Sequence, residues 1–424
     1  MSSESSCYVY MQLPGTLRVV TCGRYVLERF DDGTFRGRFV YGRSYRDNTD
    51  AVELDPGELP LRAGLYETLE LRGIFGALRD ASPDAWGRRI IERELGRSDL
   101  TELEFLLHSP EDRIGALSFG LSAKPPAPQR KFNRTLDLPR LVAVAERLDA
   151  DATSAERIPA DDLLQLRTSV GGARPKAVVE DAGALWLAKF PQKDDRWNNA
   201  PVEAAMLRLA QLCGIRTPET QVVRIAGNDV LLVKRFDRAS VPGGYLRHRM
   251  LSALTLLGAG DDHTARANWS YLRIADELRR LVERPTEALH EMFRRMVFNA
   301  LISNTDDHPR NHAVIAPTRY WQLSPAYDLT PMPQIAQEQR HLALQVGAFN
   351  RYANRENLLS HCPRFRLERA AANAIIDDMK RIVGARWREL VRAAGGSERD
   401  CEAIASAFLY PGFEYDPNVV LGRT

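Results

Sequence analysis

Cysteine is scarce in this sequence and shows no paired spacing. The 424 residues include five cysteines, which are scattered along the chain without any Cys-x-x-Cys motif. An odd number of isolated thiols argues against a disulfide framework and against a zinc site, and it fits a reducing compartment. The sequence therefore predicts a cytoplasmic protein whose fold depends on neither cross-links nor zinc.

Long apolar runs and a large net charge are also missing. No run of about 18 apolar residues occurs, and the first residues lack the basic segment and apolar core of a secretory signal. Lys and Arg together number 58 against 56 Asp and Glu, which gives a formal charge of +2. We therefore expect no membrane association and no direct binding of DNA as the main task.

What remains is the composition of an ordinary globular protein, 44% hydrophobic and 27% charged, in a chain long enough for two or three packed units. Residues 8–45 alternate apolar and polar positions, which predicts a small antiparallel sheet. Ser82 is expected to cap a helix over residues 85–94, and residues 113–120 are expected to form a strand. The Pro-rich stretch 123–135 is expected to be a linker.

The strongest chemical signal lies in residues 304–332. Asp306 and Asn311 have the Asp-x-x-x-x-Asn spacing of a protein-kinase catalytic loop, and Asp328 follows an apolar, strand-like run. If a hairpin joins the two halves, Asp306 can orient an attacking hydroxyl while the other two side chains offer oxygen ligands to magnesium. The alternative is a polar loop in which Asp and Asn cap turns.

A Gly-rich turn precedes two strands in the middle of the chain. The turn runs from Ser169 to Lys176, and the second strand, over residues 185–190, carries Lys189 near its end. Paired glycines expose backbone N–H groups to phosphates, and a lysine on the adjacent strand can neutralise their charge. No Walker A motif is present, and a plain Gly-Gly hairpin is the alternative. The turn residues expected to face ATP are Val170, Gly171, Gly172 and Ala173.

Glu203 lies early in an amphipathic helix that Gly214 terminates. In a kinase lobe, a helix glutamate pairs with the strand lysine and holds it on the phosphates, so we expect Glu203 to pair with Lys189. A glutamate that faces solvent is the alternative.

Two strand-like runs, 221–225 and 229–233, lead into a hinge-like sequence. Kinases read adenine at the strand between the lobes, through backbone groups. Phe236 is placed to pack on the base and Asp237 to reach the ribose hydroxyls, with a plain core position as the alternative for Phe236. Helical spacing of apolar residues then predicts helices over residues 251–257, 268–282, 286–302 and 367–394.

The order of these parts resembles the HipA family of bacterial toxin kinases, the serine/threonine kinases of type II toxin–antitoxin modules. The motifs that carry the resemblance over most of the chain are Phe39-Val40-Tyr41, Pro83-Asp84-Ala85-Trp86-Gly87-Arg88, Arg113-Ile114-Gly115-Ala116-Leu117, the Ser169 to Lys176 loop, Arg235-Phe236-Asp237-Arg238, Thr305-Asp306 to Asn311, and Tyr327-Asp328. We expect an α/β protein with a small β-rich N-terminal unit and a two-lobed protein-kinase-like fold whose C-terminal lobe is helical. The expected segments are an N-terminal subdomain (1–122), a linker (123–135), an N-lobe (136–237) and a C-lobe (238–424).

The resemblance also implies roles for single residues, with ATP and Mg²⁺ as cofactors. Asp306 matches the catalytic base, Asn311 and Asp328 the magnesium ligands, Lys189 the lysine on the phosphates, Lys234 and Phe236 the adenine hinge, His308 a further nucleotide-binding position, and Ser169 the serine that such kinases autophosphorylate. A phosphate on Ser169 would add about two negative charges beside the ATP phosphates and silence the enzyme. Capping of the turn is the alternative for Ser169.

Family members are usually neutralised by a small helix-turn-helix antitoxin, HipB, which binds operator DNA. The resemblance therefore implies such a partner, with DNA bound only through it. Family targets, where known, are aminoacyl-tRNA synthetases, so a protein substrate with a Ser or Thr acceptor in the translation machinery is expected. The sequence does not identify that target.

Two positions depart from the family pattern. Asp307 stands where a glycine occurs in another member, and Lys234 stands where an acidic hinge residue is common. Asp307 is expected to bring a second carboxylate near the metals and to alter metal preference. Lys234 is expected to matter little if the adenine contact runs through the backbone.

Two other functions use the same residues. A two-metal phosphohydrolase could be built from Asp306, Asp307, His308, His312 and Asp328, because carboxylates and imidazoles suit manganese or zinc. That function leaves the Gly-rich turn and Lys189 unexplained. A catalytically silent pseudokinase that acts only as a co-repressor is the other possibility, against which the retained polar catalytic positions argue.

Overall fold

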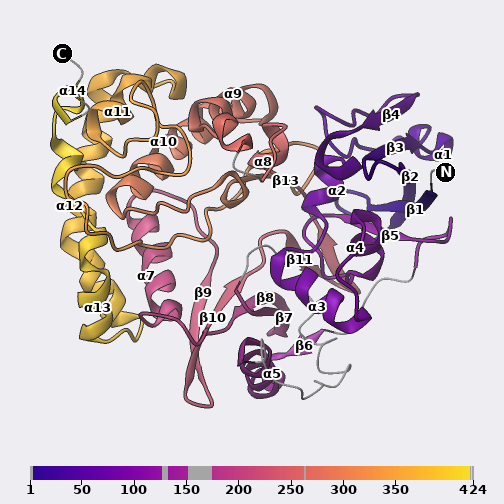
Figure 1. Cartoon of the computed structure of the whole chain (residues 1–424), viewed down its shortest axis with the longest axis horizontal. Coiled ribbons are helices and arrows are strands. Elements are labelled where there is room, and N and C mark those ends of the chain that lie inside the picture. Colours follow the sequence, from indigo (N-terminus) through magenta and orange to yellow (C-terminus); the bar gives the residue numbers. More distant parts are fainter. Residues whose placement is uncertain (1–2, 127–131, 151–173, 262–263, 421, 423–424) are drawn as a thin grey trace. The chain divides into compact units, whose positions relative to one another are not determined.

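The computed structural model describes residues 3–126, 132–150, 174–261, 264–420 and 422. Figure 1 shows the helices and strands of the chain, which divides into two compact units, each built from separate segments. Unit 1 comprises residues 1–193, 234–251 and 315–320, and unit 2 comprises residues 194–233, 252–314 and 321–424. This division by compactness does not test the four segments expected from the sequence, which stay a prediction.

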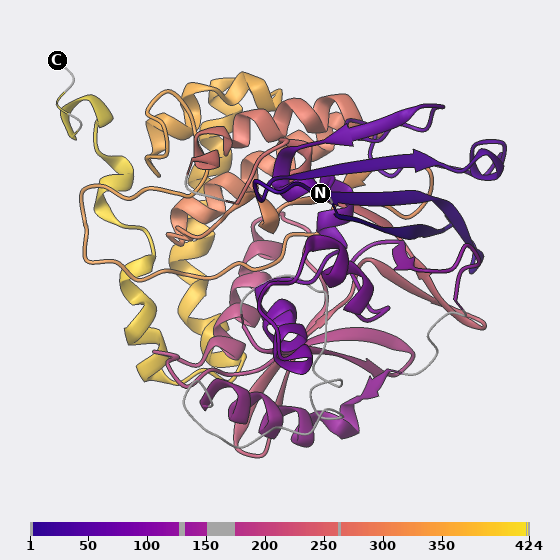
Figure 2. The ribbon, with the colours of Figure 1, turned by 45° about the vertical axis from the view of Figure 1, so that its right-hand side comes forward.

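A five-stranded antiparallel sheet with strand order β4-β3-β2-β1-β5 opens unit 1, and Figure 2 shows its long indigo strands side by side. The alternation of apolar and polar residues in the sequence places the apolar side chains on one face of this sheet. Tyr25 and Phe39, for example, are paired across β2 and β3 and are both fully buried. The predicted N-terminal sheet is confirmed, and the predicted strand over residues 113–120 is confined to its last four residues. The bounds are β1 Ser3–Gln12, β2 Val19–Arg29, β3 Phe35–Tyr41, β4 Leu65–Thr68 and β5 Leu117–Gly120.

Short helices accompany this sheet, and α4 contacts both β1 and β5. The predicted helix over residues 85–94 is present as α3, but its N-cap is Asp84, whose side chain accepts a hydrogen bond from the backbone N–H of Gly87. The expected cap, Ser82, lies two residues too early. The bounds are α1 Arg43–Arg46, η1 Glu70–Gly73, α2 Gly76–Asp80, α3 Ala85–Leu95 and α4 Glu102–His108.

The rest of unit 1 carries the strand that bears Lys189. The antiparallel pair β7 and β8 places Lys176 directly opposite Lys189, and the two-residue strand β6 runs parallel to β7. β11 and β12 form a separate hairpin. The bounds are β6 Asn133–Arg134, η2 Thr135–Asp137, α5 Leu138–Ala150, β7 Lys176–Asp181, β8 Ala184–Lys189, β11 Arg238–Val241, β12 Gly244–Arg247 and β13 Arg249–Ser252, whose last residue belongs to unit 2.

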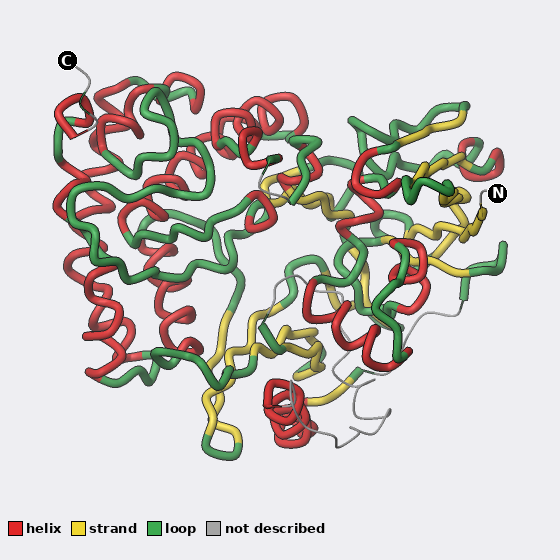
Figure 3. The backbone as a smooth tube through the Cα atoms, viewed as in Figure 1, coloured by secondary structure: helices red, strands yellow, loops and turns green. Residues whose placement is uncertain are grey.

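Unit 2 is mainly helical, as the red segments of Figure 3 show. The 25-residue helix α12 packs along α7, and α10 lies against α9 and α12. Twelve of the 17 residues of α10 are buried, because apolar side chains recur on nearly all of its faces. The predicted helices are confirmed with shifted ends. The helix bounds are α7 Asn199–Leu212, α8 Ala253–Leu256, α9 Tyr271–Leu281, α10 Pro285–Leu301, α11 Arg355–Ser360, α12 Arg369–Ala393, α13 Glu398–Ile404 and α14 Pro417–Val420.

The remaining elements of unit 2 are strands and single 3-10 turns. β9 and β10, the two strands that the sequence predicted, pair as an antiparallel hairpin. Within the described residues, no helix combines the length and the apolar character needed to cross a membrane. The bounds are β9 Thr220–Ile225, β10 Asn228–Lys234, η3 Ala265–Asn268, η4 Pro309–Asn311, β14 Ala313–Ala316, β15 Gln322–Leu323, η5 Cys362–Phe365, η6 Ala405–Ala407 and η7 Pro411–Glu414; Lys234 and residues 315–316 belong to unit 1.

Candidate active site

The buried helix α10 delivers the chain to the Asp306 loop. The helix ends at Leu301 with Ile302 as its C-cap, and Ser303 then takes a φ of +51°, a left-handed conformation that turns the chain away from the helix axis. The backbone N–H of Asn304 still donates to the carbonyl of Asn299 at 2.8 Å, which satisfies one of the last helix carbonyls. The start of the loop is therefore fixed by the end of a rigid helix.

Asp306 and Asn311 are brought together by the loop's own hydrogen bonds. The carbonyl of Asp306 accepts from the backbone N–H of His308 at 2.8 Å and from Nδ2 of Asn311 at 3.4 Å. Asp306 is exposed, whereas Asn311 is 7% exposed at the end of η4. Since Nδ2 of Asn311 points at a carbonyl, its Oδ1 is the atom available to a hard cation.

The hairpin that the convergence of these side chains requires is present between the two halves of this segment. The backbone N–H of Ser324 donates to the carbonyl of Ala313 at 2.9 Å, and the hydroxyl of Tyr327 donates to the carbonyl of Arg310 at 2.7 Å. Asp328 therefore follows a residue that is bonded directly to the Asp306 loop. Its φ of +59° is a left-handed conformation that aspartate tolerates better than most residues and that recurs at functional sites.

Asp307 takes a different position from the one expected. It is fully buried, and its Oδ2 accepts from the hydroxyl of Tyr271 and lies 2.8 Å from Nε2 of His312. The carboxylate of Asp307, which was expected near the metals, is therefore buried and bound to Tyr271 and His312. Among the described residues, no group of three or more His, Cys, Asp or Glu side chains is arranged to hold a metal ion, which gives no support to the two-metal phosphohydrolase.

Asn311 and Asp328 carry oxygen atoms that are suitable ligands for a magnesium ion. Asn311 offers an amide oxygen and Asp328 a carboxylate, and both are hard oxygen ligands of the kind that Mg²⁺ takes alongside phosphate oxygens. His308 lies in the same loop, partly buried, and the structure describes no hydrogen bond at its Nδ1. Its assignment to nucleotide binding stays a prediction.

The lysine and the glutamate expected to pair lie on separate units. Lys189 ends β8 in unit 1, and Glu203 lies in the first turns of α7 in unit 2, where it is 8% exposed. A helix glutamate buried to this degree is not the solvent-facing residue of the alternative. The pairing itself stays a prediction. The turn residues Ser169, Val170, Gly171, Gly172 and Ala173 lie outside the described residues.

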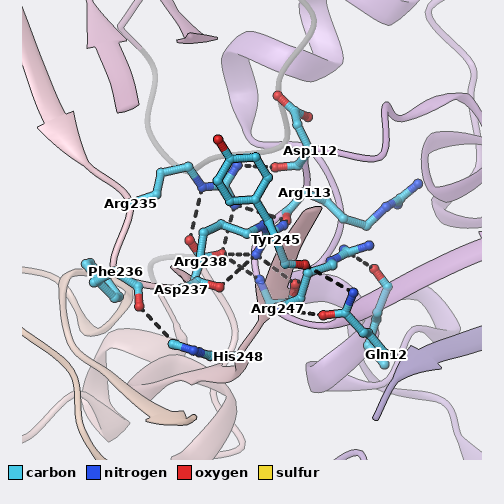
Figure 4. A network of polar contacts seen from close by, with 12 residues as sticks. Gln12, Asp112, Arg113, Arg235, Phe236, Asp237, Arg238, Tyr245, Arg247 and His248 are labelled. Carbon is cyan, nitrogen blue, oxygen red and sulfur yellow. Dashed lines mark hydrogen bonds and ion pairs between the residues drawn. The ribbon is translucent and has the colours of Figure 1, made fainter. Parts of the chain in front are cut away.

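Backbone groups of the expected hinge, residues 234–237, form hydrogen bonds to other parts of unit 1. The N–H of Arg235 donates to the carbonyl of Leu185 at 2.9 Å, and the carbonyl of Phe236 lies 3.1 Å from Nδ1 of His248 (Figure 4). Nζ of Lys234 lies 5.8 Å from the centroid of the Trp186 ring, a cation–π contact. Phe236 is half-buried, so it is neither a plain core residue nor a fully exposed one.

Asp237 is the centre of a buried network, which Figure 4 shows between β12 and the segment before β5. Its Oδ1 accepts from Nε of Arg235 at 3.0 Å, and its Oδ2 accepts from Arg235, from Arg238 and from the backbone N–H of Gly115 at 2.7–3.0 Å. Both oxygens are thus engaged within unit 1. A ribose hydroxyl would have to compete with these bonds, and the expected ribose contact stays a prediction.

Three arginines of this network also bind the loop that precedes β5. Arg235 and Arg238 donate to its backbone carbonyls at 2.5–3.2 Å, and Arg247 donates to the carbonyls of Gly115 in this loop and of Leu117, the first residue of β5, at 2.6–3.0 Å. Burial lowers the pKa of Arg247 to about 10. The negative charge of Glu111 raises this pKa, but by less than burial lowers it. The sequence reasoning missed this network. The positive φ of Gly115, +77°, is the backbone feature that lets its N–H meet Asp237. The accepting carbonyls belong to Asp112, Arg113, Gly115 and Leu117.

Two family models match the sequence. One describes the HipA N-terminal domain and matches residues 22–120. The other describes the HipA-like C-terminal domain and matches residues 168–387, which is more than half of the chain.

Curated relatives match shorter stretches. The chain is 32% identical over 165 residues to Y4dM, a candidate kinase of Sinorhizobium fredii, covering 36% of this chain and 38% of that protein. It is 24% identical over 206 residues to the serine/threonine-protein kinase toxin HipA of Shewanella oneidensis, covering 42% and 47%. The match therefore spans less than half the length of each of these relatives.

The solved structures similar to this chain include one that matches over nearly its full length. It belongs to the complex of the Shewanella oneidensis MR-1 toxin–antitoxin proteins HipA and HipB with operator DNA. The TM-score is 0.67, the sequence identity is 17%, and 94% of each chain is covered. The likeness at this identity shows the fold, a mixed α/β architecture with a β-rich N-terminal region and a helical C-terminal portion.

Proposed function

The chain belongs to the HipA family, and we propose that it is a toxin-type serine/threonine protein kinase that transfers the γ-phosphoryl group of ATP to a protein hydroxyl. The observation that carries the proposal is the closed loop from Asp306 to Asn311. It contains an exposed aspartate, Asp306, whose backbone carbonyl accepts from the buried amide of Asn311, and it is bonded to the segment that bears Asp328. Phosphoryl transfer needs positioning and charge neutralisation, which this set of residues can supply.

Each residue has one task in this proposal. Asp306 orients the acceptor hydroxyl and takes its proton late in the transfer. Asn311 and Asp328 would hold Mg²⁺, which offsets the charge of the phosphates when it is bound. Lys189 contacts those phosphates, and Glu203 holds the lysine in place.

Nucleotide recognition completes the proposed site. Lys234 and Phe236 would meet adenine at the hinge, Asp237 the ribose, and His308 the nucleotide from the Asp306 loop. The Gly-rich turn would cover the phosphates with its backbone N–H groups. Its residues Val170, Gly171, Gly172 and Ala173 are assigned to this task from the sequence.

Regulation is proposed at two levels. Autophosphorylation of Ser169 would place about two negative charges beside the ATP phosphates and oppose nucleotide binding. A helix-turn-helix antitoxin would neutralise the kinase and connect it to operator DNA, a partnership that the complex of Shewanella HipA and HipB with operator DNA suggests for this chain. The substrate would be a component of translation, such as an aminoacyl-tRNA synthetase.

Transfer of label from γ-labelled ATP tests the proposal. Wild-type protein with Mg²⁺ should label itself and a protein Ser or Thr, and its expression should arrest growth. Asp306→Ala should lower the rate of label transfer by at least about 100-fold while retaining its circular dichroism spectrum. Asp378→Ala, which removes a carboxylate that is 53% exposed on α12, is the matched control. A folded Asp306→Ala protein with wild-type transfer would overturn the assignment.

A further inference from the structure

The Asp306 loop has a buried layer that repeats the spacing of its proposed active residues. Asp306 is exposed and Asn311 ends η4, while the residue after each of them, Asp307 and His312, is 0% and 2% exposed. Nε2 of His312 lies 2.8 Å from Oδ2 of Asp307, and the hydroxyl of Tyr271 donates to the same oxygen. Each of the two proposed active residues is thus followed, one position later, by a buried residue, and these two buried residues bind each other.

We propose that Asp307 is a positioning residue, which fixes the relative placement of Asp306 and Asn311 through His312 and Tyr271. We name Tyr271, Asp307 and His312 the loop brace. The inference rests on the proposed kinase function, because it assigns the brace to the geometry of phosphoryl transfer.

The brace is anchored to two helices. Tyr271 is the first residue of α9, and its hydroxyl accepts from Nδ2 of Asn299 on α10 at 3.2 Å. Oδ1 of Asn299 accepts in turn from Nδ2 of Asn304 at 3.1 Å, at the start of the loop. The Tyr271 and His312 rings meet edge to face with centroids 5.7 Å apart, which fixes the imidazole plane. Asp307 is therefore tied to α9 directly through Tyr271 and, through Tyr271 and Asn299, to α10, which leads into the loop.

The exit of the loop is held as well. The carbonyl of His312 accepts from the backbone N–H of Ala253, at the start of α8, at 2.7 Å. His312 is thus fixed by its side chain on one side and by its backbone on the other. A loop that is restrained at both ends, and across its middle by Asp307, has little freedom to change the spacing between Asp306 and Asn311.

The chemistry of the brace favours a positioning role over a stabilising one. The Asp307 carboxylate meets a phenol and an imidazole rather than Lys or Arg, and its Oδ1 has no hydrogen bond among the described residues. Burying a carboxylate in this way costs stability. Burial first, and Asp307 second, raise the pKa of Tyr271 well above its ordinary value, so the phenol remains a hydrogen-bond donor.

Asp307→Asn keeps the shape of the side chain and removes the negative charge that strengthens the hydrogen bonds at Oδ2 with Tyr271 and His312. A displacement of about 1 Å in a reacting group costs about 100-fold in rate. We therefore expect kcat per folded molecule to fall by about 10- to 100-fold. The Mg²⁺ concentration for half-maximal activity should rise, because Asn311 loses its fixed place; a lower folded fraction alone would not move that value.

Matched pairs of variants separate the brace from general stability. Tyr271→Phe removes one hydroxyl from the brace, while Tyr410→Phe removes a buried hydroxyl that bonds to the carbonyl of Ala353 in the same unit. Only Tyr271→Phe should change kcat and the Mg²⁺ requirement. Likewise, His312→Gln retains a donor near the position of Nε2 and should recover activity that His312→Leu loses.

A readout without nucleotide is amide hydrogen exchange of the ligand-free full chain. The amides of His308 and Asn311 donate to carbonyls inside the loop, so their protection reports loop closure. Protection at both amides should fall by about 10-fold or more in Asp307→Asn and stay at the wild-type level in Tyr410→Phe. This measurement is independent of catalysis.

The outcomes distinguish the two proposals. If Asp306→Ala abolishes label transfer but Asp307→Asn and Tyr271→Phe keep wild-type kcat, Mg²⁺ requirement and amide protection, the brace is overturned and the kinase function stands. A loss in Asp307→Asn that comes only from a smaller folded fraction also overturns the brace. Losses in Asp307→Asn and His312→Leu that fail to add in the double variant would support it, because members of one unit act together.

Discussion

Lys176 and Asp84 form a buried ion pair in unit 1, with 2.6 Å between Nζ and Oδ2, although 92 positions separate them in the chain. Their side chains are 1% and 9% exposed. The carboxylate of Asp84 also caps α3, and Lys176 stands opposite Lys189 across β7 and β8. Like charges directly opposite each other destabilise a sheet. Asp84 therefore offsets the positive charge of Lys176, which stands opposite Lys189, the lysine that we assign to the ATP phosphates.

Lys176→Met should lower the free energy of unfolding by about 3–5 kcal/mol, because it leaves a buried carboxylate without its cation. Urea unfolding of the full chain, followed by circular dichroism, measures this change. Arg43→Met is the control, since it breaks an ion pair whose side chains are 89% and 67% exposed and should leave the midpoint nearly unchanged. Equal midpoints for wild type and Lys176→Met would contradict the prediction.

Asp237 should make unit 1 sensitive to acid. Burial alone would raise the pKa of its carboxyl group, but Arg235 and Arg238 outweigh burial and hold that pKa well below its usual range. A carboxyl group of this kind stabilises the fold above its unfolded pKa of about 4, and the stabilisation is lost as the pH falls toward the folded value. Wild type should therefore lose stability below about pH 4.

Asp237→Asn tests this linkage. The variant should be less stable than wild type at pH 7, because Arg235 and Arg238 lose their buried counter-charge. Its melting temperature should then fall less steeply than that of wild type between pH 4 and pH 3, about one unit below the unfolded pKa. Asp47→Asn, which removes an exposed carboxylate, should follow the wild-type curve. Parallel curves for wild type and Asp237→Asn would show that the network does not depress the carboxyl pKa.

Asp328 allows charge and backbone strain to be separated. Its φ of +59° suits Asn as well as Asp, whereas Ala in that conformation costs about 1 kcal/mol. Asp328→Asn should therefore keep wild-type stability and lose the Mg²⁺-dependent thermal shift produced by ATP. Asp328→Ala should lose the shift and also melt at a lower temperature. A full ATP shift in Asp328→Asn would remove this carboxylate from the proposed metal site.

Local patterns were enough to predict the elements that carry the site. Apolar spacing predicted α10, and the strand-like run after Asn311 indicated one strand of the hairpin on which the approach of Asp328 to the Asp306 loop depends. In both cases the spacing of the residues that must be buried along one element determines the type of that element. The spacing of Asp306 and Asn311 also survives in three dimensions, because the loop between them closes through its own hydrogen bonds.

Local sequence patterns could not predict the partners of residues whose contacts are distant in the chain. Asp307 was expected at the metals, because nothing near it in the chain points to Tyr271, 36 positions away. Asp237 was expected to reach the ribose, which stays a prediction, and nothing near it in the chain points to Gly115, 122 positions away, whose N–H binds its carboxylate. A pattern shows that a side chain is polar, and only the tertiary structure shows which buried donor satisfies it.

A crystal structure with Mg²⁺ and a non-hydrolysable ATP analogue tests the central claim most directly. The claim predicts Mg²⁺ bound by Oδ1 of Asn311 and by Asp328 at about 2.1 Å, with Nζ of Lys189 in contact with the phosphates. Asp306 should then face the γ-phosphate. A nucleotide bound elsewhere, or bound with Lys189 remote from its phosphates, would contradict the account.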